Sequence, residues 1–166
     1  MPKTVREILL AIMLVVSATA FARADSMNAG MTAFRRGDYV RAANVLGPLA
    51  LRGHARAQAM LGYLYANGLG TPQSYFAAVD LYSNAAERGN PTAQYLLGLM
   101  YDKGLGVIQD EILAYKWLNL AASGVASTRE REYYIRLRDA IASKMTSAQI
   151  AEGQWLALNW VPKSRL

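Results

Sequence analysis

A pattern that returns every 36 residues constrains this chain more than any other feature of its sequence. A period of this length is typical of helical solenoids, in which each repeat is a pair of helices that buries its apolar face against the next pair. A shorter and weaker copy of the pattern, within residues 38–53, precedes the two full copies. The main identical pairs, 36 residues apart, are Ala57 and Ala93, Gln58 and Gln94, Leu61 and Leu97, Gly62 and Gly98, Tyr65 and Tyr101, Gly68 and Gly104, Ala78 and Ala114, and Ala86 and Ala122.

Each full unit is predicted to contain two helices. Ala57, Leu61 and Leu64 recur at the spacing of one helical face, and Gly68 ends this first helix. Asp110 supplies an N-cap for the second helix of the later unit. Further signals of the same kind are Asp38 as an N-cap, Asn90-Pro91 as a cap followed by the first helical position, and Gly70 as a turn residue that needs a positive φ.

Gly62 and Gly98 stand inside predicted helices, where glycine costs about 1 kcal/mol relative to alanine. We expect close packing to offset this cost, because a glycine lets two helix backbones approach each other. Ala78 and Ala85 on the partner helix are small residues that favour the same close approach.

Two more helices are predicted after Gly124, where the repeat stops. The first begins at the capping sequence 127–130 and carries an apolar stripe of Tyr134, Leu137 and Ile141. The second begins at the similar sequence 146–149, and we expect Ile150, Trp155 and Leu158 to pack into the core. Such a pair suits the end of a solenoid, where an open apolar surface must be covered.

Residues 1–24 have the composition of a signal peptide: a basic start, an apolar run from Ile8 to Ala20, and small residues at Ala22 and Ala24. We expect cleavage between Ala24 and Asp25, because the 13 residues of the apolar run are fewer than the roughly 20 that cross a bilayer. The alternative is an anchor that stays in the membrane. The mature protein is therefore predicted to be periplasmic or secreted, with no stable membrane insertion.

Charge and cysteine content narrow the partners of the predicted mature chain. Loss of residues 1–24 lowers the formal charge from +6 to +4, and the basic residues are spread among carboxylates rather than gathered in a stripe with aromatic residues. This pattern argues against nucleic-acid binding. The chain has no cysteine, so packing alone must hold it together in an oxidising compartment.

The second full unit resembles a Sel1-like repeat almost position by position. The residues that carry this resemblance are those of 93–107, followed by Asp110, Ala114, Trp117, Ala121 and Ala122. Residues 57–90 are similar with weaker agreement, since Thr71, Ser74 and Leu81 depart from the family pattern. The resemblance implies an all-α fold, an α/α solenoid related to tetratricopeptide arrays, that acts as an adaptor or scaffold, with no cofactor and no shared catalytic residues.

The repeat boundaries and the resemblance together divide the chain into five parts. Residues 1–24 are the signal peptide, 25–54 a degenerate half repeat, 55–90 and 91–126 two Sel1-like repeats, and 127–166 the C-terminal capping helices. An exposed apolar end of so short an array would also let two copies associate as a homodimer.

A binding site is expected on the first helix of each hairpin, which lines the concave face if the repeats follow tetratricopeptide geometry. Exposed aromatic residues on such a face are favoured anchors for a bound peptide, although the same residues could instead pack against neighbouring hairpins. The positions on this face that packing does not require are predicted to be Arg56, Ala59, Tyr63, Ala66, Thr92, Tyr95, Leu99 and Asp102.

No catalytic or metal site is predicted. His54 is the single histidine, Asp38 and Asp110 are needed as caps, and the glycines around Leu69 and Leu105 close hairpins rather than cradle a phosphate. We therefore expect a module that binds a protein or peptide on its concave face and regulates an envelope process. The alternative is a protein that holds a glycan or peptide of the cell wall and is associated with an envelope enzyme.

Overall fold

The computed structural model describes residues 26–163, and within this part every regular element is a helix. The signal peptide predicted for residues 1–24 and its cleavage point lie outside the described residues. A helical segment at 26–35 is followed by α2 (Tyr39–Leu51), α3 (Ala55–Asn67), α4 (Tyr75–Ala86), α5 (Pro91–Lys103), α6 (Glu111–Gly124), α7 (Thr128–Ala142) and α8 (Ser147–Leu158). The all-α prediction is confirmed.

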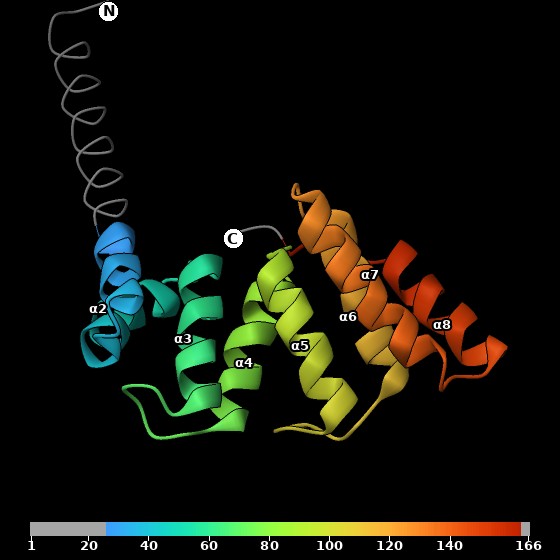
Figure 1. Ribbon diagram of the computed structural model, residues 1–166, viewed down its shortest axis with the longest axis horizontal. Coiled ribbons are helices and arrows are strands. Elements are labelled where there is room, and N and C mark those ends of the chain that lie inside the picture. The colour runs from blue at the N-terminus through green and yellow to red at the C-terminus, as the bar shows by residue number, and fades with distance from the viewer. Residues whose placement is uncertain (1–25, 164–166) are drawn as a thin grey trace, which may run out of the picture.

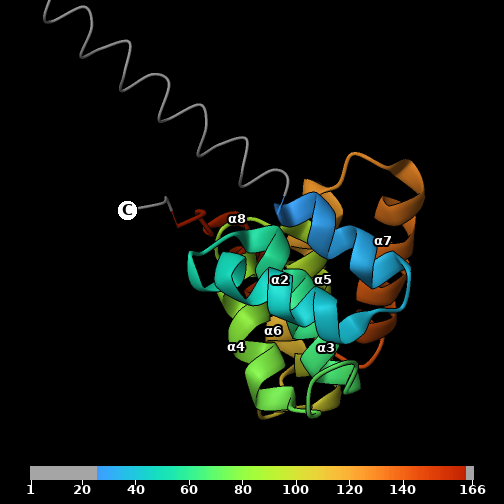
Figure 2. The same cartoon turned by 90° about the vertical axis from the view of Figure 1, so that its left-hand side faces the viewer.

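The helices follow one another along the long axis of the molecule, from α2 at one end to α8 at the other (Figure 1). Successive helices form antiparallel hairpins, α3 with α4 and α5 with α6, and each hairpin packs against the next through α2 and α3, and through α4 and α5. Seen end-on, α4 lies on one side of the stack and α3 and α7 lie on the other (Figure 2). The predicted solenoid of helical hairpins is therefore confirmed.

Helix boundaries lie where the capping residues predict them. The Asp38, Asn90 and Asp110 side chains accept hydrogen bonds from backbone N–H groups in the first turns of α2, α5 and α6. Gly68 and Gly104 end α3 and α5 in the left-handed conformation, with φ of 63° and 65°. Single residues thus determine where each hairpin turns.

A glycine in the first helix of each hairpin lies against a bulky residue of the second helix. A Cβ at Gly62 would lie 2.6 Å from Tyr82 Cε1 and 3.3 Å from the Ala78 carbonyl oxygen. The close packing expected at Gly62 and Gly98 is confirmed, and the shorter first hairpin has the same arrangement. The three pairs are Gly30 with Leu46, Gly62 with Tyr82, and Gly98 with Leu118.

Adjacent hairpins are joined by side chains that donate to the last carbonyls of the preceding helix. Gln94 Nε2 donates to the Ala86 carbonyl oxygen at 3.2 Å. One repeat earlier, Gln58 Nε2 donates to the Ala50 carbonyl oxygen at 3.1 Å, and donor and acceptor are each shifted by 36 residues. Both glutamines are buried. Each carbonyl also accepts a backbone N–H from the turn that follows its helix, that of Gly53 or Gly89, so the glutamine supplies a second donor.

Both C-terminal helices pack on α6. The apolar stripe predicted for α7 is confirmed, because Tyr134 and Ile141 are buried. The prediction for α8 is wrong in part: Trp155 and Leu158 are 62% and 83% exposed. Gly153 faces α6 instead, where a Cβ would lie 2.8 Å from Tyr115 Cδ1. The face of α8 that packs on α6 is therefore the one that carries its smallest residue.

The chain after α8 returns to the middle of the stack. The Trp160 ring meets the Trp117 ring edge-on, with centroids 6.3 Å apart. The Lys163 N–H donates to the Glu87 carbonyl oxygen at 2.7 Å, and Lys163 Nζ forms an ion pair with Glu87 at 3.5 Å. The tail thereby connects the C-terminal end with α4 and α6. Among residues 26–163, no helix is long and apolar enough to cross a membrane.

Candidate functional site

The first helices of the hairpins form one continuous side of the solenoid, which we call the A-face: segment 26–35, α3, α5 and α7. Segment 26–35 contacts α3 through the Phe34 and Tyr63 rings, and α3 contacts α5 directly. Tyr95 of α5 contacts Tyr133 and Tyr134 of α7. Side chains from distant parts of the sequence are thus brought into one row.

Aromatic rings run across this face from helix to helix. Phe34 and Tyr63 meet edge-on, with centroids 5.8 Å apart, and Tyr95 meets Tyr133 in the same way at 5.9 Å. Tyr95 also stacks on Tyr134, with centroids 4.7 Å apart and the rings tilted by 17°. Contacts of this kind fix ring positions, so the row is held in place before any partner arrives.

The exposed part of this row consists chiefly of Tyr63 and Tyr133, at 38% and 44% exposure. Tyr95 is half-buried, and its hydroxyl lies 3.5 Å from that of Tyr133. Burial, and after it the hydrogen bond to Tyr133, raises the pKa of Tyr95. Burial likewise raises the pKa of Tyr134. These phenols remain protonated at neutral pH and offer hydrogen-bond donors.

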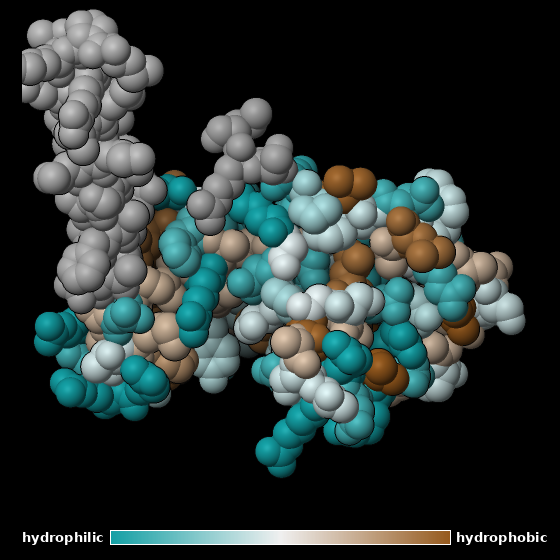
Figure 3. All heavy atoms as spheres, turned by 90° about the horizontal axis from the view of Figure 1, so that it is seen from above, coloured by the Kyte–Doolittle hydropathy of each residue, from teal (hydrophilic) through white to brown (hydrophobic). Residues whose placement is uncertain are grey.

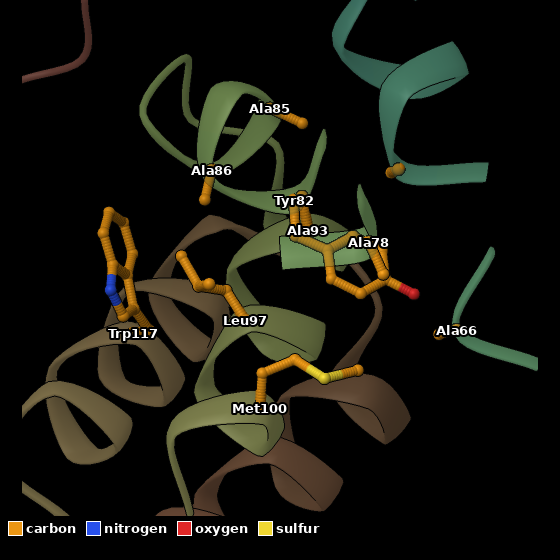
Figure 4. Close-up of a cluster of buried hydrophobic side chains, with 10 residues drawn as sticks. Ala66, Ala78, Tyr82, Ala85, Ala86, Ala93, Leu97, Met100 and Trp117 are labelled. Atoms are coloured by element: carbon orange, nitrogen blue, oxygen red, sulfur yellow. The ribbon is translucent and has the colours of Figure 1, made fainter. Parts of the chain in front are cut away.

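Tyr82 reaches toward the A-face from the opposite layer. Its ring passes over Gly62, and Figure 4 shows its hydroxyl directed toward the part of α3 that carries Ala66. The side chain is fully buried, and its hydroxyl has no hydrogen-bond partner within the described chain. Burial raises its pKa, and the nearby Tyr63 and Tyr95 raise it further.

The other predicted site residues occupy the two ends of the A-face helices. Arg56 and Thr92 are exposed in the first turns of α3 and α5. Asp102, near the end of α5, is half-buried, and its carboxylate forms an ion pair with Lys144 at 3.3 Å. Leu99 is half-buried one turn before it.

Two residues that were predicted to be free of packing contacts lie in the core instead. Ala59 and Ala66 are 4% and 7% exposed and pack in the cluster that contains Tyr82. The prediction for these two alanines is wrong because Tyr82 is long enough to reach the A-face side of α3. Alanine leaves room for its ring.

The sequence did not identify Phe34, Tyr133 and Tyr134 as members of this face. Phe34 lies in a segment without the 36-residue pattern, and α7 lies beyond the last repeat. The adjacent pair Tyr133-Tyr134 was a usable signal. On a helix, one member of such a pair can face the core while the other faces outward.

Apolar side chains elsewhere on the surface are more scattered. Seen from above, they form separate patches among polar residues, more of them toward the half that contains α7 and α8 (Figure 3). Phe76 and Ile108, 79% and 90% exposed, border a hollow beside the loop at Gly106. Within residues 26–163, no three histidine, aspartate or glutamate side chains are grouped so that they could hold a metal ion.

Comparisons with known proteins agree with this architecture. The family model for the Sel1 repeat matches residues 55–90 and 91–124. The chain is similar to c5321, described as a protective antigen present in uropathogenic Escherichia coli strains displaying an SLR fold, with a TM-score of 0.77, 26% identity, and coverage of 87% of this chain and 31% of that chain. It is also similar to a Sel1 repeat protein from Oxalobacter formigenes, with a TM-score of 0.54, 35% identity, and coverage of 57% of this chain and 39% of that chain.

The chain thus spans only 31% and 39% of the lengths of these two structures. A search of curated proteins found no match.

Proposed function

Because the chain contains two Sel1 repeats, we propose that it is an exported interaction module whose A-face binds a segment of another protein. Sel1-repeat proteins are generally protein-interaction modules. The module has the role of an adaptor or scaffold in a process of the bacterial envelope.

The row of aromatic rings on the A-face is the observation that carries this proposal. Tyr63 and Tyr133 are 38% and 44% exposed, whereas Tyr82 and Tyr134 of the same fold are buried. Tyrosine is enriched among the residues that contribute most to binding energy, because a rigid ring loses little entropy and its hydroxyl adds a hydrogen bond. The contacts with Phe34 and Tyr95 hold these rings in place.

The experiment that tests the A-face is a capture assay with the full chain produced in a host that exports it. The variant Tyr63→Ala, Tyr133→Ala is compared with a control variant, Leu51→Ala, Phe76→Ala, which removes two exposed apolar side chains outside the A-face. We expect proteins of the envelope that the parent and the control retain to be lost from the A-face variant. Equal capture by all three, at equal helical content, would contradict the proposal.

Export is proposed from the sequence of residues 1–24, which ends in Ala22-Arg23-Ala24. Mass spectrometry of the protein recovered from fractionated cells is expected to give a chain that begins at Asp25 in the periplasm or the medium. A chain that retains Met1 and fractionates with the cytoplasm would refute this part of the proposal.

A cell-wall ligand is the second candidate, since exposed tyrosine rings also stack on sugar rings. In the same assay, binding of purified cell wall that depends on Tyr63 and Tyr133, without capture of any protein, would support this alternative.

We propose further that α8 allows self-association, because Trp155 and Leu158 are exposed one turn apart on it. Sedimentation is expected to show a dimer at high concentration that Trp155→Ala weakens. A monomer at every concentration would remove this proposal.

A further inference from the structure

Positive charge is concentrated on the helices that form the A-face. Segment 26–35, α3, α5 and α7 carry seven basic and four acidic side chains, a net charge of +3. The other helices, α2, α4, α6 and α8, carry two basic and three acidic side chains, a net charge of −1. The two sets of helices therefore differ in the sign of their charge, although the chain as a whole is only mildly basic.

Each exposed tyrosine of the A-face shares its side of a helix with exposed arginine. On α7, Arg129, Tyr133 and Arg136 stand at positions i, i+4 and i+7, which lie on one helical face. On α3, Arg56 precedes Tyr63 by seven residues, which again places both side chains on one face. All three arginines are exposed. Guanidinium groups therefore border the aromatic row on both α3 and α7.

The carboxylates of the A-face helices leave these arginines unpaired. Asp139 pairs with Arg138 at 2.8 Å, and Asp102 pairs with Lys144 at 3.3 Å. The other two carboxylates of these helices belong to α7 and lie beyond ion-pair distance of the arginines: Glu130 and Glu132. Within residues 26–163, the three arginines therefore have no carboxylate partner.

The A-face thus presents hydrogen-bond donors and positive charge together. A guanidinium group binds a carboxylate through two parallel, charge-assisted hydrogen bonds, and a phenol hydroxyl can donate to the same kind of oxygen. A basic segment would be repelled by the arginines, and a neutral one would leave them without acceptors of negative charge. An acidic segment is the occupant whose charge complements this face.

The spacing of the two exposed tyrosines fits an extended chain. Tyr63 and Tyr133 lie on α3 and α7, and α5 packs between these helices through Tyr95. Neighbouring packed helices lie roughly 8–10 Å apart, so the two rings are separated by about 16–20 Å. An extended segment rises about 3.3 Å per residue and crosses this distance with about five or six residues. Carboxylates at alternate residues of such a segment would all face the solenoid.

We propose that the A-face binds an extended acidic segment of its partner, with Tyr63 and Tyr133 as aromatic anchors and with Arg56, Arg129 and Arg136 paired to its carboxylates. This inference rests on the proposed function, since it names the chemistry of the partner that the A-face takes.

The test uses the full chain with ¹³C-labelled tyrosine rings and, as the probe, a synthetic peptide of alternating glutamate and alanine about ten residues long. NMR titration at about 0.1 M salt, where charges more than about 10 Å apart are screened, is expected to shift the signals of Tyr63, Tyr95 and Tyr133. A peptide with glutamine in place of glutamate has the same length and no side-chain charge. Its affinity should be at least about ten-fold lower, because it forms none of the three ion pairs.

Variants that change one charge locate the site. Arg129→Gln and Arg136→Gln should each weaken the affinity for the glutamate peptide about two- to five-fold, the range of an exposed ion pair, and combining both with Arg56→Gln should weaken it at least about ten-fold. Glu132→Gln removes a negative charge from α7 and should strengthen binding. The matched control is Arg41→Gln, which removes an exposed positive charge from α2 and should leave the affinity unchanged.

Three results would overturn the inference. The first is no binding of the glutamate peptide, or equal affinity for the glutamate and glutamine peptides. The second is an equal effect of Arg41→Gln and Arg136→Gln, which would show that the attraction is not specific to the A-face. The third is tighter binding of a single-stranded oligonucleotide or of chitotetraose to the same tyrosines.

The capture assay keeps the proposed function separate from this inference. Loss of captured proteins in the Tyr63→Ala, Tyr133→Ala variant would still support a protein-binding A-face when the glutamate peptide fails to bind. Equal capture by that variant and the parent would contradict the proposed function itself.

Discussion

Replacing Gly62 by alanine tests the packing that sets the distance between α3 and α4. The new Cβ would lie 2.6 Å from Tyr82 Cε1 and 3.3 Å from the Ala78 carbonyl oxygen. The ring must move by roughly 0.8 Å to restore an ordinary contact of about 3.4 Å, but it is fully buried and cannot rotate away. Overpacking of this kind costs about 1–3 kcal/mol, whereas alanine gains about 1 kcal/mol in helix propensity.

Because the buried ring cannot yield, we take the packing cost at the upper end of this range, about 3 kcal/mol, and after the propensity gain expect Gly62→Ala to lower the free energy of unfolding by about 2 kcal/mol. At Gly98 the new Cβ would lie 3.0 Å from Leu118 Cγ, and this flexible side chain can yield. Gly98→Ala should therefore change the free energy of unfolding by less than about 1 kcal/mol.

Urea unfolding followed by circular dichroism measures the difference. With a slope of about 1–3 kcal/mol per molar urea, the midpoint of Gly62→Ala should fall by roughly 0.7–2 M. Ala151→Gly, at an exposed position of α8, measures the propensity difference in this protein. A Gly62→Ala variant as stable as the parent, or more stable by the amount that Ala151→Gly loses, would refute the reasoning.

Three further predictions concern a hairpin junction, the C-terminal tail and the buried tyrosine. Gln94→Ala should cost about 0.5–1.5 kcal/mol in urea unfolding, because the Ala86 carbonyl loses the bond from Gln94 but keeps the Gly89 N–H as a donor. Trp160→Ala should lower the thermal midpoint clearly, whereas Trp155→Ala, which removes a ring that is 62% exposed, should not. Burial raises the pKa of Tyr82 in the folded protein, so above about pH 10 the unfolded chain releases this proton first and the folded state loses stability. The urea midpoints at about pH 9 and pH 11 should therefore differ less in Tyr82→Phe than in the parent.

The sequence was sufficient for the helix boundaries because these depend on single residues with local effects. Asp110 caps α6 and Gly104 ends α5 through contacts within one turn of each residue. The 36-residue pattern predicted contacts between helices, because identical residues at equivalent positions of two repeats imply the same packing in both. Gly62 and Gly98 could be assigned to close contacts for this reason.

The same reasoning failed where docking depends on a small residue outside the repeat. Helix α8 has apolar residues on more than one side, so a search for the largest ones selected Trp155 and Leu158. The helix docks through Gly153 and Ala157, whose small size brings it close to Tyr115. Glycine contributes no apolar signal, and only the shape of α6 distinguishes the two faces.

The candidate site could be predicted at its centre but not at its edges. Tyr63 and Tyr95 belong to the repeat and could be placed by alignment, whereas Phe34 and Tyr133 reach the same row from helices that the repeat does not include. Their contacts are set by how hairpins stack, which a periodic pattern does not specify.

Gly62 and Tyr82 form one slot between α3 and α4. The glycine sets the distance between the two helices, and the ring that fills the slot ends in a buried hydroxyl with no hydrogen-bond partner within the described chain. In the flanking hairpins leucine fills the equivalent slot and carries no polar atom. Because phenylalanine would fill the slot without burying an unpaired hydroxyl, Tyr82→Phe should leave the free energy of unfolding unchanged or raise it, whereas Gly62→Ala lowers it. A clear loss of stability in Tyr82→Phe would show that a bound water satisfies the hydroxyl in the folded protein.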